Sequence, residues 1–147
     1  MLWGSNARET HPIFFHHVLK AVRKGARLYV VDPRRTSSAE WAEGWLPVEV
    51  GADVALANGI AHVILEEGLE HKEFIANATE NFEAYKELAL RYDLARTSKL
   101  TGIAPEMIRK LARDYATADR AMICWTLGIT EHHNAVDNVL SLINLGL

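Results

Sequence analysis

The chain from residue 27 to residue 33 reads Arg27-Leu-Tyr-Val-Val-Asp-Pro33. Its apolar residues are consecutive and mostly β-branched or aromatic, and the Asp-Pro pair that follows ends a strand. A strand that is apolar on both faces is typical of a parallel sheet covered by helices on both sides. We therefore expect residues 27–31 to form a strand of such a sheet.

Upstream of this strand the pattern is strand, turn and helix. Residues 2–3 read as a short strand, and a helix follows with Thr10 as its N-cap and Pro12 in its first turn. The apolar positions of this helix recur at helical spacing and are Phe14, Val18, Ala21 and Val22. A helix between two such strands completes a βαβ unit.

Downstream, residues 46–50 form a weaker strand candidate, which Pro47 restricts to an edge or irregular position. Residues 53–67 are apolar nearly all round and predict a deeply packed helix. Residues 68–102 are helical but more polar, with Phe82, Tyr85 and Ala89 on one face, which indicates a covering layer.

The last third repeats the alternation. Pro105 opens a helix, residues 121–125 form a strand, and a last helix runs from about 134 to 145. The residues expected to be buried on these two helices are Met107, Ile108, Leu111, Ala112 and Tyr115, then Val136, Val139, Leu140 and Ile143. Strands alternating with helices predict an α/β fold with a mainly parallel sheet and helices on both faces.

Composition limits the classes of protein that fit. The chain has 147 residues, 49% apolar and 24% charged, which is enough for one domain with a real core. Sixteen basic against 19 acidic residues give a net charge of −3, which argues against a nucleic-acid surface or a polybasic membrane patch. Cys124 is the single cysteine, so the chain forms no internal disulfide and no metal cluster held by cysteines. A single cysteine is consistent with a reducing compartment.

The sequence has no apolar stretch long enough for a membrane span and no signal-peptide pattern, so we expect no membrane insertion and a cytoplasmic location. Both ends have patterns that predict continuation, a strand at the start and a helix reaching Gly146 at the end. We expect the chain to be a piece of a longer protein.

In this fold class, ligands bind beyond the carboxyl ends of the strands. Four segments fall there: Gly4-Ser5-Asn6, Asp32-Pro33-Arg34-Arg35, Gly51-Ala52-Asp53 and Leu127-Gly128-Ile129-Thr130-Glu131. Asp32 suits ribose hydroxyls, and the two arginines suit a phosphate or a base. Asp53 is the first residue of a predicted helix. Its carboxylate suits a guanine edge, and the free N–H groups at the start of the helix suit an anion. Taken singly, each segment is equally consistent with ordinary turn chemistry.

Motifs for other sites are absent. Neither G-x-G-x-x-G nor G-x-x-x-x-G-K-[ST] occurs, which argues against a standard NAD site or P-loop. Adjacent helical histidines such as His16 and His17 point about 100° apart, so they do not share one ion easily. His62 fits a satisfied core histidine or one beside a cofactor. Cys124 fits a buried inert thiol, and no Ser-His-Asp order stands out. We predict no catalytic residue and no metal ligand.

Four spaced motifs carry a resemblance to a known family. They are Trp-Gly-Ser-Asn-Ala-Arg-Glu-Thr-His-Pro (3–12), Gly-Ala-Arg-Leu-Tyr-Val-Val-Asp-Pro-Arg-Arg-Thr (25–36), Val-Gly-Ala-Asp-Val-Ala-Leu (50–56) and Trp-Thr-Leu-Gly-Ile-Thr (125–130). In this order, over nearly all of the chain, they resemble the molybdopterin-guanine-dinucleotide oxidoreductases of the DMSO reductase type, and within them the formate dehydrogenase alpha subunits.

The resemblance implies a Rossmann-like three-layer domain, residues 1–147, that holds one of two molybdopterin guanine dinucleotides binding molybdenum or tungsten. It assigns the cofactor to residues of all four segments: Gly4, Ser5, Asn6, Asp32, Pro33, Arg34, Gly51, Asp53, Leu127, Gly128, Thr130 and Glu131. Two positions depart from the family pattern. Ala52 replaces a threonine, and Glu131 replaces an amide, so a carboxylate stands near an anionic cofactor.

The resemblance further implies formate oxidation to carbon dioxide in a parent enzyme, with two electrons leaving through iron-sulfur centres. Its metal ligand, iron-sulfur cysteines and C-terminal cofactor domain are not in these residues, so the chain alone is expected to be inactive. The expected partners are the remaining domains and iron-sulfur or NAD-linked electron-transfer subunits. The alternatives are another member of the family, such as a nitrate reductase, a non-catalytic nucleotide-binding module, and metal-dependent hydrolysis using the histidine pairs.

Overall fold

A four-stranded parallel sheet lies at the centre of the molecule, and the computed structural model describes all of residues 1–147. Its strands are β1 (Leu2–Trp3), β2 (Tyr29–Val31), β3 (Gly44–Leu46) and β4 (Cys124–Trp125). Their order across the sheet is β3-β2-β1-β4, and Leu2 stands opposite both Val30 and Cys124. The predicted parallel sheet is confirmed, with β1 and β2 as its inner strands.

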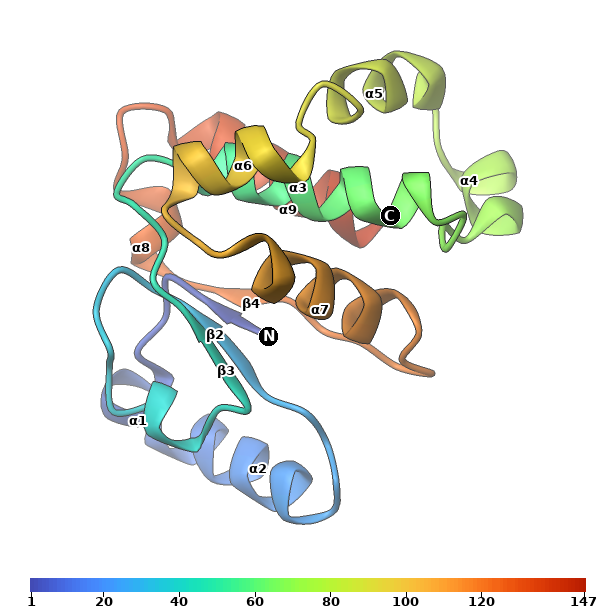
Figure 1. The fold of residues 1–147 in the computed structure, drawn as a ribbon. Coiled ribbons are helices and arrows are strands. Elements are labelled where there is room, and N and C mark those ends of the chain that lie inside the picture. The colour runs from blue at the N-terminus through green and yellow to red at the C-terminus, as the bar shows by residue number, and fades with distance from the viewer.

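Helices cover both faces of this sheet (Figure 1). One face carries α1 (Ala7–Thr10), α2 (Pro12–Arg23) and the 3-10 turn η1 (Ala39–Trp41). The other carries α3 (Asp53–Glu66), α6 (Leu94–Thr101), α7 (Pro105–Ala116) and α9 (Ala135–Gly146). Two short helices, α4 (Lys72–Ala78) and α5 (Phe82–Ala89), lie farther from the sheet, and α8 (Leu127–Thr130) follows β4. The three-layer α/β fold is therefore confirmed.

Alternation along the strands divides the core between the two faces. Trp3 and Val31 belong to the larger cluster, which includes residues of α3, α7 and α9. Leu2 and Val30 point the other way and pack with Phe15 of α2. Because successive strand residues point to opposite faces and both faces are covered, both sets must be apolar. This explains the uninterrupted apolar run from which the sheet was predicted.

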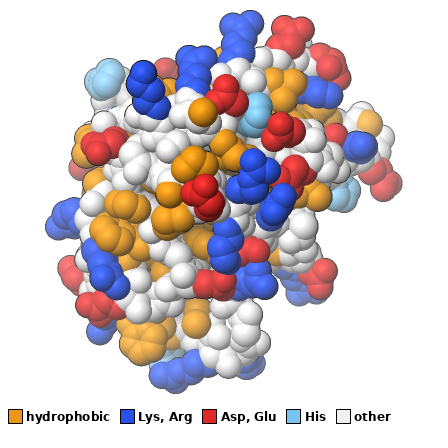
Figure 2. Space-filling model, in the orientation of Figure 1, with side chains coloured by type: hydrophobic (Ala, Val, Ile, Leu, Met, Phe, Trp, Pro, Cys, Tyr) orange, Lys and Arg blue, Asp and Glu red, His pale blue; other side chains and the backbone are white.

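Helix α3 is the deeply packed helix that the sequence predicts. Its apolar residues are buried on several sides because α6, α7 and α9 all pack against it. Residues 68–102 form α4, α5 and α6, which confirms a helical layer there. None of the helices combines the length and the apolar character needed to cross a membrane. Acidic and basic side chains are interspersed over the face shown in Figure 2, with apolar patches between them.

The first helix differs in detail from the prediction. It begins at Pro12 with His11 as its N-cap, because Thr10 is already the last residue of α1. Its one fully buried side chain is Phe15, whereas Phe14 and Ala21 are exposed. Thr10 as N-cap is therefore wrong: a separate turn of helix occupies residues 7–10 and shifts the start of α2.

The buried face of α9 also differs from the prediction. Val136, Leu140 and Ile143 are exposed and Val139 is half-buried. The residues that face the interior are Asn138, Ser141, Leu142 and Leu145. Asn138 turns inward because its amide donates to the Ile129 carbonyl of α8, and the Ser141 hydroxyl donates to the Asn138 carbonyl. These bonds compensate for burying polar groups and leave an apolar stripe outside.

Two strands are shorter or shifted relative to the prediction. β3 spans Gly44–Leu46 and ends before Pro47, so the strand expected at 46–50 overlaps it at a single residue. Its predicted edge position is confirmed. β4 keeps only the last two residues of the run 121–125. Cys124 within it is half-buried rather than buried, and its thiol is free.

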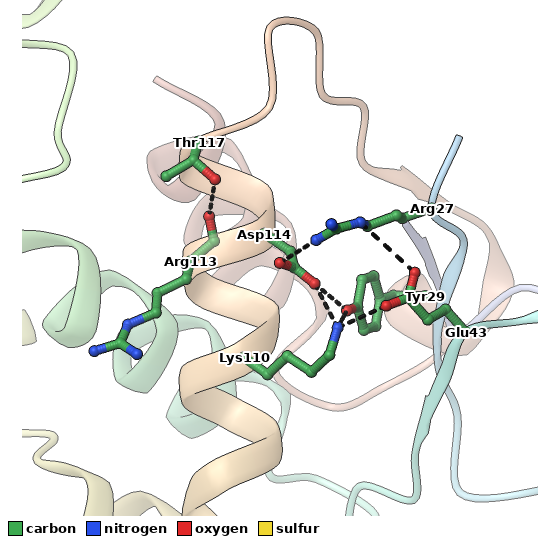
Figure 3. Close-up of polar contacts among 7 residues, drawn as sticks. All are labelled: Arg27, Tyr29, Glu43, Lys110, Arg113, Asp114 and Thr117. Carbon is green, nitrogen blue, oxygen red and sulfur yellow. Dashed lines mark hydrogen bonds and ion pairs between the residues drawn. The ribbon is translucent and has the colours of Figure 1, made fainter. Parts of the chain in front are cut away.

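An ionic cluster ties α7 to the amino ends of β2 and β3 (Figure 3). The ammonium of Lys110 donates to Glu43 and to Asp114, both at 2.7 Å. Asp114 also accepts hydrogen bonds from the Tyr29 hydroxyl and from Arg27. Burial raises the pKa of Asp114, but the bonds from Lys110 and Tyr29 and the charge of Arg27 outweigh it and hold the pKa below its ordinary value.

We expect Asp114→Asn to lower the free energy of unfolding at pH 7 by about 1–2 kcal/mol, because a charged acceptor shared by three donors is lost. The lower end applies if solvent screens Lys110 and Arg27, whose side chains are 53% and 59% exposed. Because folding lowers the pKa of Asp114, its carboxylate stabilises the chain at pH values above the pKa of an unfolded aspartate, about 3.9. This stability is lost as the pH falls through the lower pKa of the folded state. Urea unfolding between pH 7 and pH 2 should therefore show the two proteins converging in acid.

The control for this prediction is Asp119→Asn. Asp119 is exposed and forms no hydrogen bond or ion pair in the chain. Its replacement should leave the stability unchanged at every pH. A constant difference between Asp114→Asn and the parent chain down to pH 2 would contradict the role assigned to the Asp114 carboxylate.

Candidate functional site

The carboxyl ends of all four strands lie at one edge of the sheet, because the strands are parallel. The turn 4–6 leaves β1 there, residues 32–38 leave β2, and residues 47–52 lead from β3 to the start of α3. Thr126 connects β4 to α8 at the same edge. The fold thus brings the four predicted segments to one side of the molecule.

Two glycines join the first and last of these segments. The carbonyl of Gly4 accepts hydrogen bonds from the Thr126 hydroxyl at 2.9 Å and from the Gly128 amide at 3.1 Å. A Cβ at Gly4 would lie 2.8 Å from the carbonyl carbon of Gly128, and a Cβ at Gly128 would lie 2.6 Å from the Gly4 carbonyl oxygen. Gly4 also has φ +56°, a conformation that L side chains rarely adopt. Both positions therefore require glycine.

The Asp32 loop is held in place from several directions. The Asp32 amide donates to Leu46 at 3.2 Å, and its carbonyl accepts from the Trp45 indole at 2.8 Å. The side chain is 8% exposed, and Oδ1 accepts from the Arg34 amide at 2.9 Å. Oδ2 has no partner in the chain and is not one of the fully buried unpaired atoms, so it still reaches solvent. One carboxylate oxygen is thus fixed and the other is available.

The residues after Asp32 include one arginine that contacts an aromatic ring and one that forms no ion pair. Pro33, Arg34 and Arg35 are exposed. The Arg35 guanidinium lies over the Trp45 ring, 5.9 Å from its centroid, whereas Arg34 forms no ion pair in the chain. Thr36 is buried, and its hydroxyl has no hydrogen-bond partner. An unpartnered buried hydroxyl is costly unless a water or a ligand completes it.

Asn6 links the β1 exit to this loop. Its side-chain oxygen accepts hydrogen bonds from the Ser37 and Ser38 hydroxyls, each at 3.2 Å. Ser5 beside it is almost fully buried. The Ser37 hydroxyl also donates to Glu9, and with Asn6 it lowers the pKa of that carboxyl below its ordinary value. Sequence reasoning missed Ser37 and Ser38, although two hydroxyl residues directly after the predicted loop were a usable signal.

Asp53 reaches the same edge from α3. It is the first residue of that helix and is 5% exposed. Its Oδ1 accepts a hydrogen bond from the Trp3 indole at 2.8 Å. Gly51 is exposed, has φ +86°, and has no atom within 4 Å of where a Cβ would be. Backbone conformation, rather than space, is what favours glycine at this turn.

The β4 exit segment exposes most of its predicted residues. Leu127, Gly128, Thr130 and Glu131 are exposed, while Ile129 is fully buried and anchors α8. Glu131 forms no ion pair in the chain. The exposed backbone of α8 therefore lies directly beside Gly4, with the Glu131 carboxylate at its end.

Other candidate chemistry is not assembled. The rings of His16 and His17 are 6.3 Å apart at 75°, and no group of three or more His, Cys, Asp or Glu residues could hold a metal ion. His62 is buried on α3 as predicted, but its Nδ1 has no hydrogen-bond partner, so it is not the satisfied core histidine expected. The edge offers carboxylate acceptors, a free guanidinium, hydroxyls and exposed backbone, which suits binding of a polar ligand rather than bond making by the chain itself.

A parallel sheet with helices on both faces and polar residues gathered at its carboxyl edge defines a Rossmann-like α/β domain. The family model of molybdopterin oxidoreductase matches residues 1–147, the whole length of the chain. The chain belongs to this family, which implies a molybdopterin cofactor.

Several family members are similar over the whole chain. F420-dependent formate dehydrogenase 2 subunit alpha of Methanococcus maripaludis is 37% identical over 147 residues, all of this chain and 22% of that protein. Formate dehydrogenase H of Escherichia coli is 38% identical over 146 residues, 99% and 20% of the two chains. The solved structure of acetylene hydratase from Pelobacter acetylenicus matches with a TM-score of 0.92 and 34% identity. The match covers 98% of this chain and 20% of the acetylene hydratase chain. Nitrate reductases match at lower identity. The chain thus spans about a fifth of these relatives.

Proposed function

We propose that this chain is the part of a molybdenum or tungsten formate dehydrogenase that holds a molybdopterin guanine dinucleotide. The observation that carries this proposal is a pair of buried carboxylates at the carboxyl edge, Asp32 and Asp53. Each has one oxygen held by an N–H of the chain and one oxygen without a partner. The similarity to formate dehydrogenase alpha subunits supports the assignment of the reaction.

The residues present fit the guanosine end of such a cofactor. Ribose hydroxyls can donate hydrogen bonds to Asp32, and the N–H groups of guanine can donate to the free oxygen of Asp53. The unpaired Arg34 suits a phosphate, and the unpartnered Thr36 hydroxyl suits a further polar group. The contact between Gly4 and Gly128 leaves no room for a Cβ at either position and holds the exposed α8 backbone beside the β1 exit, where it can face the cofactor.

The chain contributes binding and orientation to the reaction. When bound, the cofactor supplies the two-electron oxidation of formate to carbon dioxide. The loops after β1 and β4 orient it through the Gly4–Gly128 contact, which fixes two backbone segments relative to each other. Metal ligation and electron transfer to an acceptor would come from other domains of the longer chain and from iron-sulfur or NAD-linked subunits in the cytoplasm.

A second candidate is another reaction of the same family, such as nitrate reduction. Nitrate reductases and an acetylene hydratase match almost the same residues as the formate dehydrogenases. We therefore expect these residues to reflect the cofactor that the family shares rather than the substrate of one member. The metal ligand and its neighbours in the longer chain would distinguish the two candidates.

Calorimetric titration with guanosine diphosphate, adenosine diphosphate and NAD tests the site. We expect guanosine diphosphate to bind most tightly, and Asp32→Ala to weaken it about tenfold or more, since a hydrogen bond to a charged group contributes about 1.5–3 kcal/mol.

Asp119→Ala is the matched control, because it removes an exposed carboxylate that forms no hydrogen bond or ion pair. It should leave the affinity unchanged. Equal binding of all three nucleotides, or tighter binding of NAD, would contradict guanine recognition and favour a non-catalytic nucleotide-binding module.

A further inference from the structure

Trp3 and Asp53 form a buried pair that connects the sheet to the start of α3. The Trp3 side chain is completely buried at the end of β1, and Asp53 is 5% exposed. The indole Nε1–H donates to Oδ1 of Asp53 at 2.8 Å, across 50 residues of sequence. A fully buried tryptophan packed in the main core cluster is a rigid donor, because the surrounding side chains fix its ring.

The two oxygens of Asp53 have different environments. Oδ1 is occupied by the indole, which is a donor only and therefore must be matched by an acceptor. Oδ2 has no hydrogen-bond partner in the chain and is absent from the fully buried unpaired atoms, so it reaches solvent. The indole bond thus selects one orientation of the carboxylate and leaves a single acceptor directed away from the core.

The position of the pair relates it to the rest of the edge. Trp3 immediately precedes Gly4, whose carbonyl holds Thr126 and Gly128. Asp53 is therefore fixed to the same strand end that fixes the α8 backbone. Side chains held by a second layer of hydrogen bonds bind ligands better, because less conformational entropy is lost on binding.

We propose that Trp3 is a positioning residue for ligand recognition: its indole N–H holds Asp53 so that Oδ2 accepts from the N–H groups of a guanine base. The inference rests on the proposed function, since it assumes that Asp53 takes the base. Trp3 itself, with no exposed surface, does not touch the ligand.

The first test is a double-mutant cycle on guanosine diphosphate affinity, measured by calorimetry on residues 1–147. We expect Trp3→Phe to weaken binding about tenfold, because the indole N–H donor is lost while an aromatic ring still fills part of the site. Asp53→Ala should weaken binding at least as much. Adding Trp3→Phe to Asp53→Ala should then weaken it no further, since residues that act through one contact are not additive.

The second test uses base preference, which a merely structural tryptophan would not change. In Asp53→Asn the indole would hold the amide oxygen, so the NH2 group must take the place of Oδ2 and turn an acceptor into a donor. Xanthine has a carbonyl where guanine has its 2-amino group. We therefore expect Asp53→Asn to prefer xanthosine diphosphate to guanosine diphosphate, and Trp3→Phe in that background to reduce this preference severalfold.

Trp125→Phe is the matched control. Trp125 stands beside Trp3 in the adjacent strand, is half-buried, and its indole has no hydrogen bond. It should leave affinity and base preference unchanged. If Trp3→Phe fails to fold, indole ¹⁵N labelling of the parent chain replaces it: the Trp3 N–H resonance should shift on Asp53→Asn substitution and on nucleotide binding, more than that of Trp125.

The outcomes separate the two proposals. Suppose that the parent chain selects guanine. If Trp3→Phe then weakens binding equally in the parent chain and in Asp53→Ala, or does not weaken it at all, the positioning role alone is overturned. An unmoved Trp3 resonance would do the same. A parent chain that does not select guanine would overturn the proposed function, and the inference with it.

Discussion

Gly4→Ala should be among the most damaging single-methyl additions to this chain, lowering the free energy of unfolding by about 3 kcal/mol. Two costs combine. The φ of +56° places an alanine in the left-handed region, and the new Cβ would lie 2.8 Å from backbone carbon of Gly128. Backbone cannot rotate away as a flexible side chain can, so either β1 or α8 must shift. Urea unfolding at pH 7 measures the loss.

Two matched variants separate these costs. Gly128→Ala makes the same close contact from the other side without a positive φ, so we expect a loss of about 2 kcal/mol. Gly68→Ala has φ +66° and open space around its Cβ, so we expect a loss of about 1 kcal/mol. If Gly4→Ala costs no more than Gly68→Ala, the contact with Gly128 is looser than described.

The sheet could be predicted from local sequence because burial on both faces leaves a local signature. Residues 28–31 are all apolar, since neither face of β2 meets water. The position of β3 was harder to predict, because its three residues include a glycine and stand at the sheet edge. There the Pro47 that follows was the stronger signal, and it marked the end of the strand rather than its middle.

The buried face of α9 could not be predicted from hydropathy. Its sequence offers an apolar stripe through Val136, Leu140 and Ile143, yet these side chains are exposed. Asn138 is buried because a carbonyl of α8 is available to it. That carbonyl lies nine residues upstream, outside α9, so no spacing within α9 indicates it.

The candidate site shows the same division between local and long-range information. The segments at the strand exits follow from the alternation of strands and helices, and all four lie at the carboxyl edge. The pairings within the site join distant residues, as in Trp3 with Asp53 and Asn6 with Ser38. Such pairings decide which oxygens remain available to a ligand, and they follow only from the folded structure.

The close packing of α3 against α6 depends on Gly59. A Cβ at this position would collide with the side chain of Thr97, whose exposed fraction is zero. The Thr97 hydroxyl donates to the Tyr92 carbonyl at 3.0 Å, so its side chain is held and has no free rotamer to adopt. Helix propensity alone favours alanine over glycine by about 1 kcal/mol. The contact opposes this preference directly.

We therefore expect Gly59→Ala to destabilise the chain by about 2 kcal/mol, since overpacking costs about 1–3 kcal/mol and exceeds the gain in propensity. Thr97→Ala should restore part of this loss in the double variant, although alone it is destabilising because it removes a buried hydrogen bond. Gly146→Ala, a helical glycine with open space around its Cβ, should change the stability little. Thermal and urea unfolding of the four variants give the coupling between positions 59 and 97. Strict additivity would mean that the methyl group added at position 59 does not press on Thr97, and it would contradict the close contact between α3 and α6 at this point.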